Sequence, residues 1–209
     1  MTQNCPLCDG LGKVFYQNRD TYYQCKTCSG IFVDKADRPD STVEKSRYEI
    51  HENNVEDMGY QKFVAPITSS IIRDFSKNDK GLDFGAGTGS AISKVLRDNG
   101  FNVLQYDPYF HDYPEFLEQK YDYIACCEVI EHFYNPKKEF LLLYDLLKNN
   151  ARLYCMTDLY DDSIDFALWY YKNDPTHVFF YQSKTIEWIK KEFGFLNVSI
   201  EKRLITFIR

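Results

Sequence analysis

Two short cysteine pairs near the N-terminus are the feature that most constrains the fold of this 209-residue chain. Residues 5–8 and 25–28 each read CxxC, and a glycine follows each pair after one more residue. A CxxC turn directs two thiolates at one point, and two such turns brought together make a tetrahedral four-thiolate zinc site. The pattern therefore predicts a structural zinc ion, with these ligands: Cys5, Cys8, Cys25 and Cys28.

The alternatives to zinc are a disulfide pair and a thioredoxin-like redox CxxC, but neither predicts two matched turns. Between the pairs, residues 13–16 and 21–24 read as strands around a polar turn. Strands and cysteine turns together predict a zinc ribbon over residues 1–40. Such a small unit buries too little apolar surface to fold alone, so the metal would supply folding free energy.

The charge balance limits the partners of the chain. It carries 25 Lys+Arg against 31 Asp+Glu, a formal net charge of −6, which argues against an obligatory nucleic-acid partner. Residues 1–40 hold five basic and five acidic side chains, so the ribbon has no evident basic face and a packing role is expected for it. No apolar run is long enough to span a bilayer, and the polar N-terminus lacks a signal-peptide pattern. These features predict a cytoplasmic protein with reduced thiols.

Beyond residue 79, strand-like and helix-like segments alternate. A polar linker is expected over 35–47, and an interrupted helix over 48–75. The strands are expected at 80–84, 102–106, 121–126, 152–156, 196–202 and 204–208, and the helices at 90–99, 136–149 and 183–193. This alternation predicts an α/β, Rossmann-like, largely parallel sheet whose last two strands pair antiparallel. The expected units are a ribbon over 1–40, a linker and helical cap over 41–79, and a ligand-binding domain over 80–209.

A glycine-rich loop joins the first of these strands to the first helix. Gly85, Gly87 and Gly89 give a GxGxG spacing, whereas the dinucleotide fingerprint GxGxxG would need a glycine at Ser90. Asp107 follows the next strand, where an acid accepts hydrogen bonds from a ribose diol. Nucleotide and adenosyl cofactors both use such an acid, so Asp107 alone does not separate them.

Three runs now resemble the class I S-adenosylmethionine (SAM)-dependent methyltransferases: residues 82–89, residues 106–108, and residues 121–132 with Asn135-Pro136. The resemblance covers about residues 48–209 and is closest to the ubiquinone-biosynthesis O-methyltransferase-like group, which carries EVIEH after the fourth strand. A set of bacterial methyltransferases with an N-terminal zinc ribbon is also similar. The resemblance implies a seven-stranded sheet with an antiparallel last strand. Residues 109–120 are short for a full third strand and its helix, so one edge of the sheet is expected to be trimmed.

The resemblance also implies residue roles. The glycines would lie against the methionine part of SAM, and Asp83 would hold the loop or meet the amino group. Asp107 would bind the ribose hydroxyls, and Tyr48 and His51 would cover the site. The implied cofactor-binding residues are Tyr48, Asp83, Gly85, Ala86, Gly87, Gly89, Asp107, Cys127 and Glu128.

Methyl transfer to a hydroxyl needs a group that removes the proton. Glu128, Glu131 and His132 are spaced i, i+3 and i+4, which would place them on one face at a helix start. With His177 they would make a magnesium or manganese site, as in related ubiquinone-pathway and small-RNA methyltransferases. The alternatives are an acid-capped helix start without metal and His177 as a metal-free general base or as a structural histidine.

The acceptor is expected to be a small molecule. Aromatic side chains near residue 165 would either line a pocket for a flat phenolic acceptor or fill the core: Tyr160, Phe166, Trp169, Tyr170 and Tyr171. Two other functions stay open, a methyltransferase acting on protein or RNA docked through the ribbon, and a non-enzymatic cofactor-binding module. A nicotinamide oxidoreductase is disfavoured by the GxGxG spacing and the EVIEH run.

Overall fold

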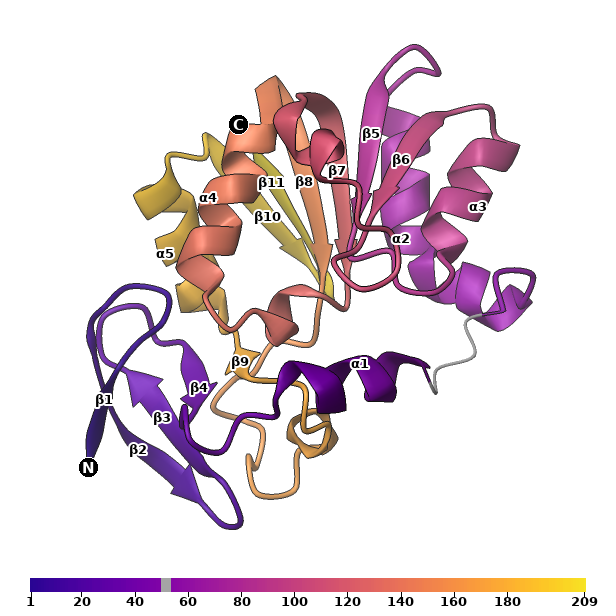
Figure 1. The fold of residues 1–209 in the computed structure, drawn as a ribbon. Helices are drawn as coiled ribbons and strands as arrows, with labels where there is room; N and C mark the ends of the chain where they lie inside the picture. The colour runs from indigo at the N-terminus through magenta and orange to yellow at the C-terminus, as the bar shows by residue number, and fades with distance from the viewer. Residues whose placement is uncertain (50–53) are drawn as a thin grey trace.

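The computed structural model describes residues 1–49 and 54–209, and two β-sheets organise them (Figure 1). The smaller sheet has the strand order β1-β2-β3-β4-β9 and the larger one β10-β11-β8-β7-β5-β6. The smaller sheet comprises β1 (Thr2–Asn4), β2 (Leu11–Gln17), β3 (Thr21–Cys25), β4 (Ile31–Val33) and β9 (Phe179–Phe180). The larger comprises β5 (Lys80–Phe84), β6 (Asn102–Tyr106), β7 (Tyr121–Cys127), β8 (Leu147–Met156), β10 (Asn197–Glu201) and β11 (Leu204–Ile208).

The larger sheet confirms the predicted α/β architecture. Strands β6, β5, β7 and β8 are parallel, β11 runs antiparallel to β8, and β10 pairs antiparallel with β11. The described residues form six strands in this sheet, not seven. After β6 the chain makes a bridge between Asp107 and His111 and a short 3-10 helix, η1 (Pro114–Glu118), before entering β7. The edge of the sheet is therefore trimmed, as the short segment 109–120 predicted.

Helices cover both faces of the larger sheet (Figure 1). They are α2 (Met58–Asp74) and α3 (Ala91–Asp98) on one face, and α4 (Pro136–Leu146) and α5 (Ser183–Phe193) on the other. Side chains alternate along β7, so Ile124 joins the core under α4 and α5, while Tyr123 joins the core under α2 and α3. No helix among the described residues is both long and apolar enough to cross a membrane.

The predicted helix over 48–75 is wrong in its bounds. Helix α1 (Ser41–Glu49) begins inside the segment expected to be a linker, because the Asp40 carboxylate accepts hydrogen bonds from the amides of Thr42 and Val43. Helix α2 begins only at Met58, and Pro66 lies inside it without ending it.

The helix predicted over 136–149 also ends early. Helix α4 stops at Leu146, and β8 starts at once with Leu147, which pairs with Tyr121 at the beginning of β7. Strand β8 is therefore longer than predicted, because pairing with its neighbours continues to the N-terminal end of β7.

The ribbon strands agree with their prediction, and the two cysteine turns match each other. The amide of Cys5 donates to the carbonyl of Gly10 at 2.8 Å, and that of Cys25 donates to Gly30 at 2.9 Å. One result was not expected. The sheet that the first forty residues begin is completed by β9, which comes from the far end of the chain and pairs with β4.

Candidate active site

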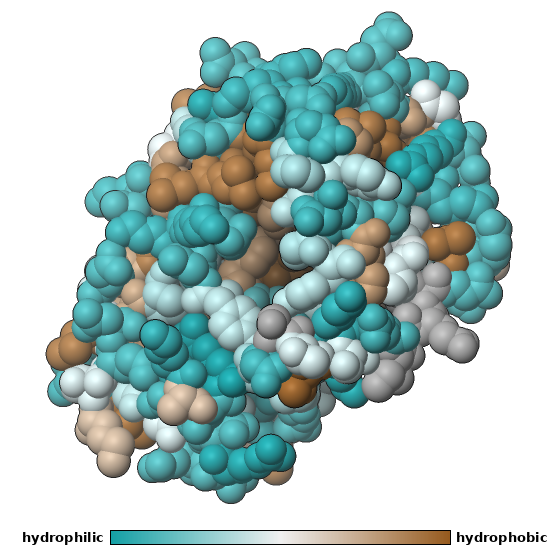
Figure 2. Space-filling model, viewed as in Figure 1, coloured by the Kyte–Doolittle hydropathy of each residue, from teal (hydrophilic) through white to brown (hydrophobic). Residues whose placement is uncertain are grey.

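A cavity with a volume of about 1170 Å³ lies at the carboxyl ends of β5, β6 and β7. Figure 2 shows this face of the molecule hollowed near its middle, with hydrophobic surface in the depth and beside the opening. The predicted cofactor residues that line the cavity are Tyr48, Gly85, Ala86, Gly87, Asp107, Cys127 and Glu128. The predicted residue His51 lies outside the described residues.

Two positions of the predicted glycine loop, Gly85 and Gly87, have a backbone conformation that favours glycine. Gly85 and Gly87 have φ of +79° and +59°, and a Cβ on Gly85 would lie 2.4 Å from Cγ2 of Val129. Gly89 and Asp83 do not line the cavity.

Asp83 is fully buried behind the loop, and this burial raises the pKa of its carboxyl. It accepts hydrogen bonds from the hydroxyls of Ser90 and, at 2.7 Å, Ser93. Asp83 therefore connects the end of β5 to the start of α3. This position agrees with the first of the two roles implied for it, holding the loop, and not with contact to the amino group of SAM.

Asp107 is 7% exposed, lines the cavity, and supports the same loop. Its Oδ2 accepts from the Gly87 amide at 2.9 Å, and its Oδ1 accepts from the amides of Tyr109 at 2.9 Å and Phe110 at 3.2 Å. A carboxylate offers about four acceptor positions. Three backbone donors leave the group able to accept one more hydrogen bond from a ligand.

Helix α1 contributes one wall of the cavity. The Glu44 carboxylate accepts hydrogen bonds from the Tyr48 and Tyr109 hydroxyls, both at 2.9 Å, and its burial raises the pKa of Glu44. On the same helix, Arg47 pairs with Asp174 at 3.2 Å. These contacts hold α1 across the ends of the strands (Figure 1), which places Tyr48 where it was expected to cover the site.

Glu131, His132 and His177 converge, with their potential ligand atoms within 4.8 Å of one another. The Nδ1 atoms contact backbone carbonyls, that of His177 at 2.7 Å from Tyr171 and that of His132 at 3.0 Å from Thr176. A carbonyl only accepts, so each Nδ1 carries a proton and a neutral ring keeps its lone pair on Nε2. Burial lowers the pKa of His177, which favours the neutral ring, and both histidines line the cavity.

The expectation that Glu128 shares a helix face with Glu131 and His132 is wrong. Glu128 has a φ of +52°, and only a three-residue 3-10 helix, η2 (Ile130–His132), follows it. The Glu128 carboxylate instead accepts from Nη2 of Arg203, at 2.7 and 2.8 Å, and from the Tyr171 hydroxyl at 3.2 Å. Glu128 lines the cavity but does not join the group formed by Glu131 and the histidines.

Tyr171 connects the two acids. Its hydroxyl lies 2.5 Å from Oε1 of Glu131 and 2.9 Å from Oγ1 of Thr157, and all three side chains are buried. Burial is the main cause that raises the pKa of Glu131, and it also raises the pKa of Glu128 to about 8. Sequence reasoning missed Arg203 and Thr157, because no pattern in their segments distinguishes them from ordinary polar residues.

The aromatic side chains of residues 160–171 both fill the core and line the cavity, the two alternatives given for them. Four of its rings pack in a core cluster that includes Tyr22 of β3, namely Tyr160, Phe166, Trp169 and Tyr171. Tyr170 and Tyr171 line the cavity at η3 (Tyr170–Asn173), so Tyr171 belongs to both the core and the cavity wall.

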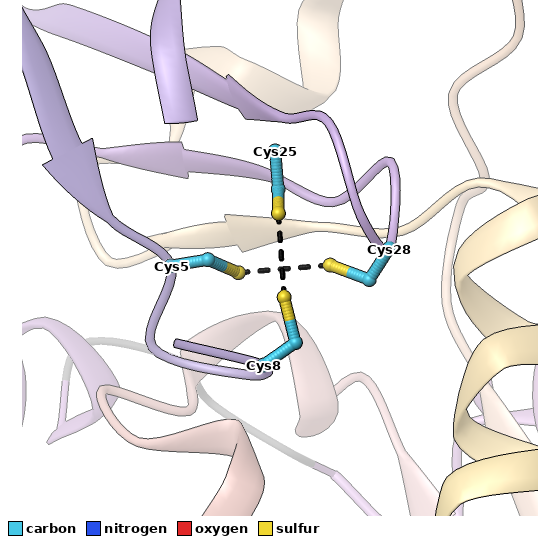
Figure 3. A group of neighbouring side chains, drawn as sticks. All are labelled: Cys5, Cys8, Cys25 and Cys28. Atoms are coloured by element: carbon cyan, nitrogen blue, oxygen red, sulfur yellow. Dashed lines mark hydrogen bonds between the residues drawn. The ribbon is translucent and has the colours of Figure 1, made fainter. Parts of the chain in front are cut away.

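The four ribbon cysteines point their sulfurs at one centre (Figure 3). Sγ of Cys5 lies 3.6 Å from Sγ of Cys28, and Sγ of Cys8 lies 3.3 Å from Sγ of Cys25. A disulfide needs about 2.05 Å, and Zn–S bonds of about 2.3 Å in a tetrahedron separate the sulfurs by about 3.8 Å. The donor set therefore fits a four-coordinate zinc ion and not a pair of disulfides.

Comparison with known proteins identifies the family. A family model described as "Methyltransferase domain" matches residues 59–200, more than half of the chain, so the chain belongs to this family. None of the curated proteins searched matches it.

Solved structures of several methyltransferases resemble this chain. An O-methyltransferase family protein from Burkholderia thailandensis superposes with a TM-score of 0.54 at 14% identity, over 79% of this chain and 61% of that one. This chain therefore spans less than two thirds of that protein. A SAM-dependent methyltransferase from Archaeoglobus fulgidus gives 0.54 at 19% identity, over 77% and 76%. Magnesium protoporphyrin IX methyltransferase from Synechocystis, with bound SAM, gives 0.50 at 17% identity, over 81% and 91%. The fold is thus that of SAM-dependent methyltransferases.

Proposed function

We propose that this chain binds SAM and transfers its methyl group to a hydroxyl of a small acceptor, aromatic or phenolic in character. One observation carries the proposal. A single cavity is lined by the glycine loop and Asp107 and also by His132 and His177, together with Cys127 and Glu128. A SAM-bound methyltransferase structure of the same fold, and an O-methyltransferase family protein among the similar structures, favour the assignment.

The residues have distinct tasks in this reaction. SAM, when bound, supplies a methyl group on a sulfonium, a good leaving group. Gly87 and Asp107 would bind and orient the nucleoside, so that positioning provides much of the rate enhancement. The bound SAM would give its methyl group to the acceptor oxygen, with an O–CH₃ bond formed as the S–CH₃ bond breaks, and S-adenosylhomocysteine (SAH) would be the leaving product. The hydroxyl proton moves to Nε2 of His177, whose Nδ1–H is already held by the Tyr171 carbonyl.

A divalent metal is the alternative way of activating the hydroxyl. Glu131, His132 and His177 would hold magnesium or manganese, and the metal would lower the pKa of a bound hydroxyl. Both Nδ1 atoms are bonded to carbonyls, which is the usual support of metal-binding histidines. Glu128 would not be a ligand, because Arg203 and Tyr171 engage its oxygens. Loss of turnover in chelator, restored by Mg²⁺ or Mn²⁺, would favour this alternative.

We also propose that the four-cysteine centre holds a structural zinc ion. All four positions would be filled by protein, which leaves no open position for chemistry. Reduced thiols are needed for this site, so a cytoplasmic location accompanies the proposal.

Two measurements separate the proposed function from its alternatives, which are an enzyme that acts on protein or RNA and a binding module without enzymatic activity. Isothermal calorimetry with SAH and with NAD tests the cofactor, and binding of NAD alone would overturn the methyltransferase assignment. SAH release measured over phenols, sugars, peptides and RNA then tests the acceptor. Turnover with RNA or peptide alone would favour an enzyme that acts on macromolecules, and SAH binding without turnover on any acceptor would favour a binding module.

A further inference from the structure

Strand β9 links the four-cysteine ribbon directly to the segment that carries His177. It pairs antiparallel with β4, with Ile31 opposite Phe180 and Phe32 opposite Phe179. The pairing continues one residue further, because the Val33 amide donates to the Val178 carbonyl at 3.0 Å. Figure 1 shows β9 lying beside β4, although their positions in the chain are far apart.

Phe179 is packed against the second cysteine turn. It is fully buried and stacks on Phe32, with ring centroids 6.4 Å apart and an interplanar angle of 11°. A Cβ on Gly30 would lie 2.3 Å from Cζ of Phe179, so the turn has room for this ring only because residue 30 is glycine. The carbonyl of Gly30 accepts from the Cys25 amide, which makes Phe179 a neighbour of the metal-binding turn.

The other edge of this segment holds the turn that carries Glu131 and His132. The Val178 amide donates to the Glu131 carbonyl at 2.9 Å, so Val178 bonds to the ribbon through its carbonyl and to the acid turn through its amide. The carbonyl of Thr176 accepts from Nδ1 of His132 at 3.0 Å. His177 therefore lies two residues before β9 and next to Val178, the residue that is hydrogen-bonded to both the ribbon and the acid turn.

We propose that Phe179 is a positioning residue, through which the four-cysteine ribbon sets the orientation of His177 and His132. In this arrangement the ribbon supports the segment that carries His177 from outside the cavity and is not an arm that docks a macromolecule. The relevance of this inference to catalysis rests on the proposed function. The structural connection itself rests on the contacts between β4, β9 and the Ile130–His132 turn.

Histidine NMR tests the link without knowledge of the acceptor. The chain has four histidines, so ring signals of isotopically labelled protein can be assigned by single substitutions. Phe179→Leu should shift the ring signals of His132 and His177, since their rings lie 4.8 Å apart and respond to each other's orientation. The signal of His111 should not move. Removal of zinc by a chelator should shift the same two signals in the unmutated protein.

Phe207→Leu is the matched control. Phe207 is as buried as Phe179 but lies in β11, so it should leave the His132 and His177 signals in place. A folded Phe179→Leu variant with unmoved signals would overturn the inference, as would equal shifts in both variants. If Phe179→Leu does not fold, Gln182→Met serves instead. It removes the hydrogen bond of 2.8 Å from Nε2 to the Ser29 carbonyl and should produce a smaller shift of the same signals.

Calorimetry with SAH separates this inference from the proposed function. The Phe179→Leu variant should keep wild-type affinity for SAH, because the glycine loop and Asp107 follow β5 and β6 of the larger sheet, whereas β9 belongs to the smaller sheet. Absence of SAH binding in the unmutated protein would overturn the proposed function. The positioning role of Phe179 would then be decided by the NMR result alone. Normal SAH binding with unmoved histidine signals would defeat only the positioning role.

Discussion

The guanidinium of Arg203 holds both carboxylate oxygens of Glu128, at 2.7 and 2.8 Å, although 75 residues separate the two. Arg203 lies in the turn between β10 and β11, and Glu128 follows β7, so the pairing reaches across the end of β8, which lies between β11 and β7 in the larger sheet. It keeps the Glu128 carboxylate engaged beside the cavity and away from the cluster of Glu131 and the histidines. A four-ligand metal site that includes Glu128 would require this ion pair to break.

Replacing a ribbon cysteine should remove zinc and destabilise the protein. We expect Cys25→Ser to lower the free energy of unfolding by at least about 3 kcal/mol, because structural zinc sites contribute about 10 kcal/mol or more. Cys155→Ser is the control, since Cys155 is buried in the large sheet and outside the cluster. Zinc analysis and thermal unfolding provide the measurement, and less than about half an equivalent of zinc in native protein would contradict a one-ion site.

Removing the acid after β6 should weaken cofactor binding. Asp107→Ala deletes an acceptor at the cavity and releases the Gly87 amide, so the Kd for SAH should rise about tenfold to a hundredfold, or 1.4 to 2.8 kcal/mol. Asp112→Ala, at an exposed position nearby, should leave the Kd unchanged. Equal affinities of the Asp107 variant and the unmutated protein would refute a role in ribose binding.

Removing the candidate base should separate turnover from binding. In His177→Ala we expect turnover to fall by about a hundredfold or more, the range typical of general bases. The Kd for SAH should stay close to the wild-type value, because the hydroxyl that His177 would deprotonate belongs to the acceptor and not to SAH. His111→Ala controls for the loss of an imidazole elsewhere, and wild-type turnover in His177→Ala would exclude this residue from the mechanism.

The buried Glu44 should make stability depend on pH. Burial raises its pKa above the ordinary value of 4.5, so the folded state retains a proton that the unfolded state loses. The free energy of unfolding should therefore fall as the pH rises from about 4.5 through the raised pKa, by up to about 1.4 kcal/mol per pH unit. Glu44→Gln keeps partners for both tyrosine hydroxyls and should flatten this slope. An identical slope in denaturant titrations of both proteins would contradict the prediction.

Some elements were predictable because their signals are local. Strands β5 and β6 and helices α3 and α5 match the predicted segments within about two residues, since apolar spacing, a capping serine and terminal glycines lie in the elements themselves. Helix α1 was missed because Glu44 is its one clearly buried described residue and its remaining surface is polar. Strand β9 was missed because two residues are too few to show periodicity.

The sequence alone determined the four-cysteine cluster, the alternating sheet and helices, and the glycine loop with its following acid, because each depends on spacing along a short stretch of chain. Only the tertiary structure decided which carboxylates meet which partners. Glu128 pairs with Arg203, Glu131 meets Tyr171 and His177, and β9 joins the ribbon to the site. These contacts unite residues from distant segments, and their strength depends on exclusion of water, which no local pattern encodes.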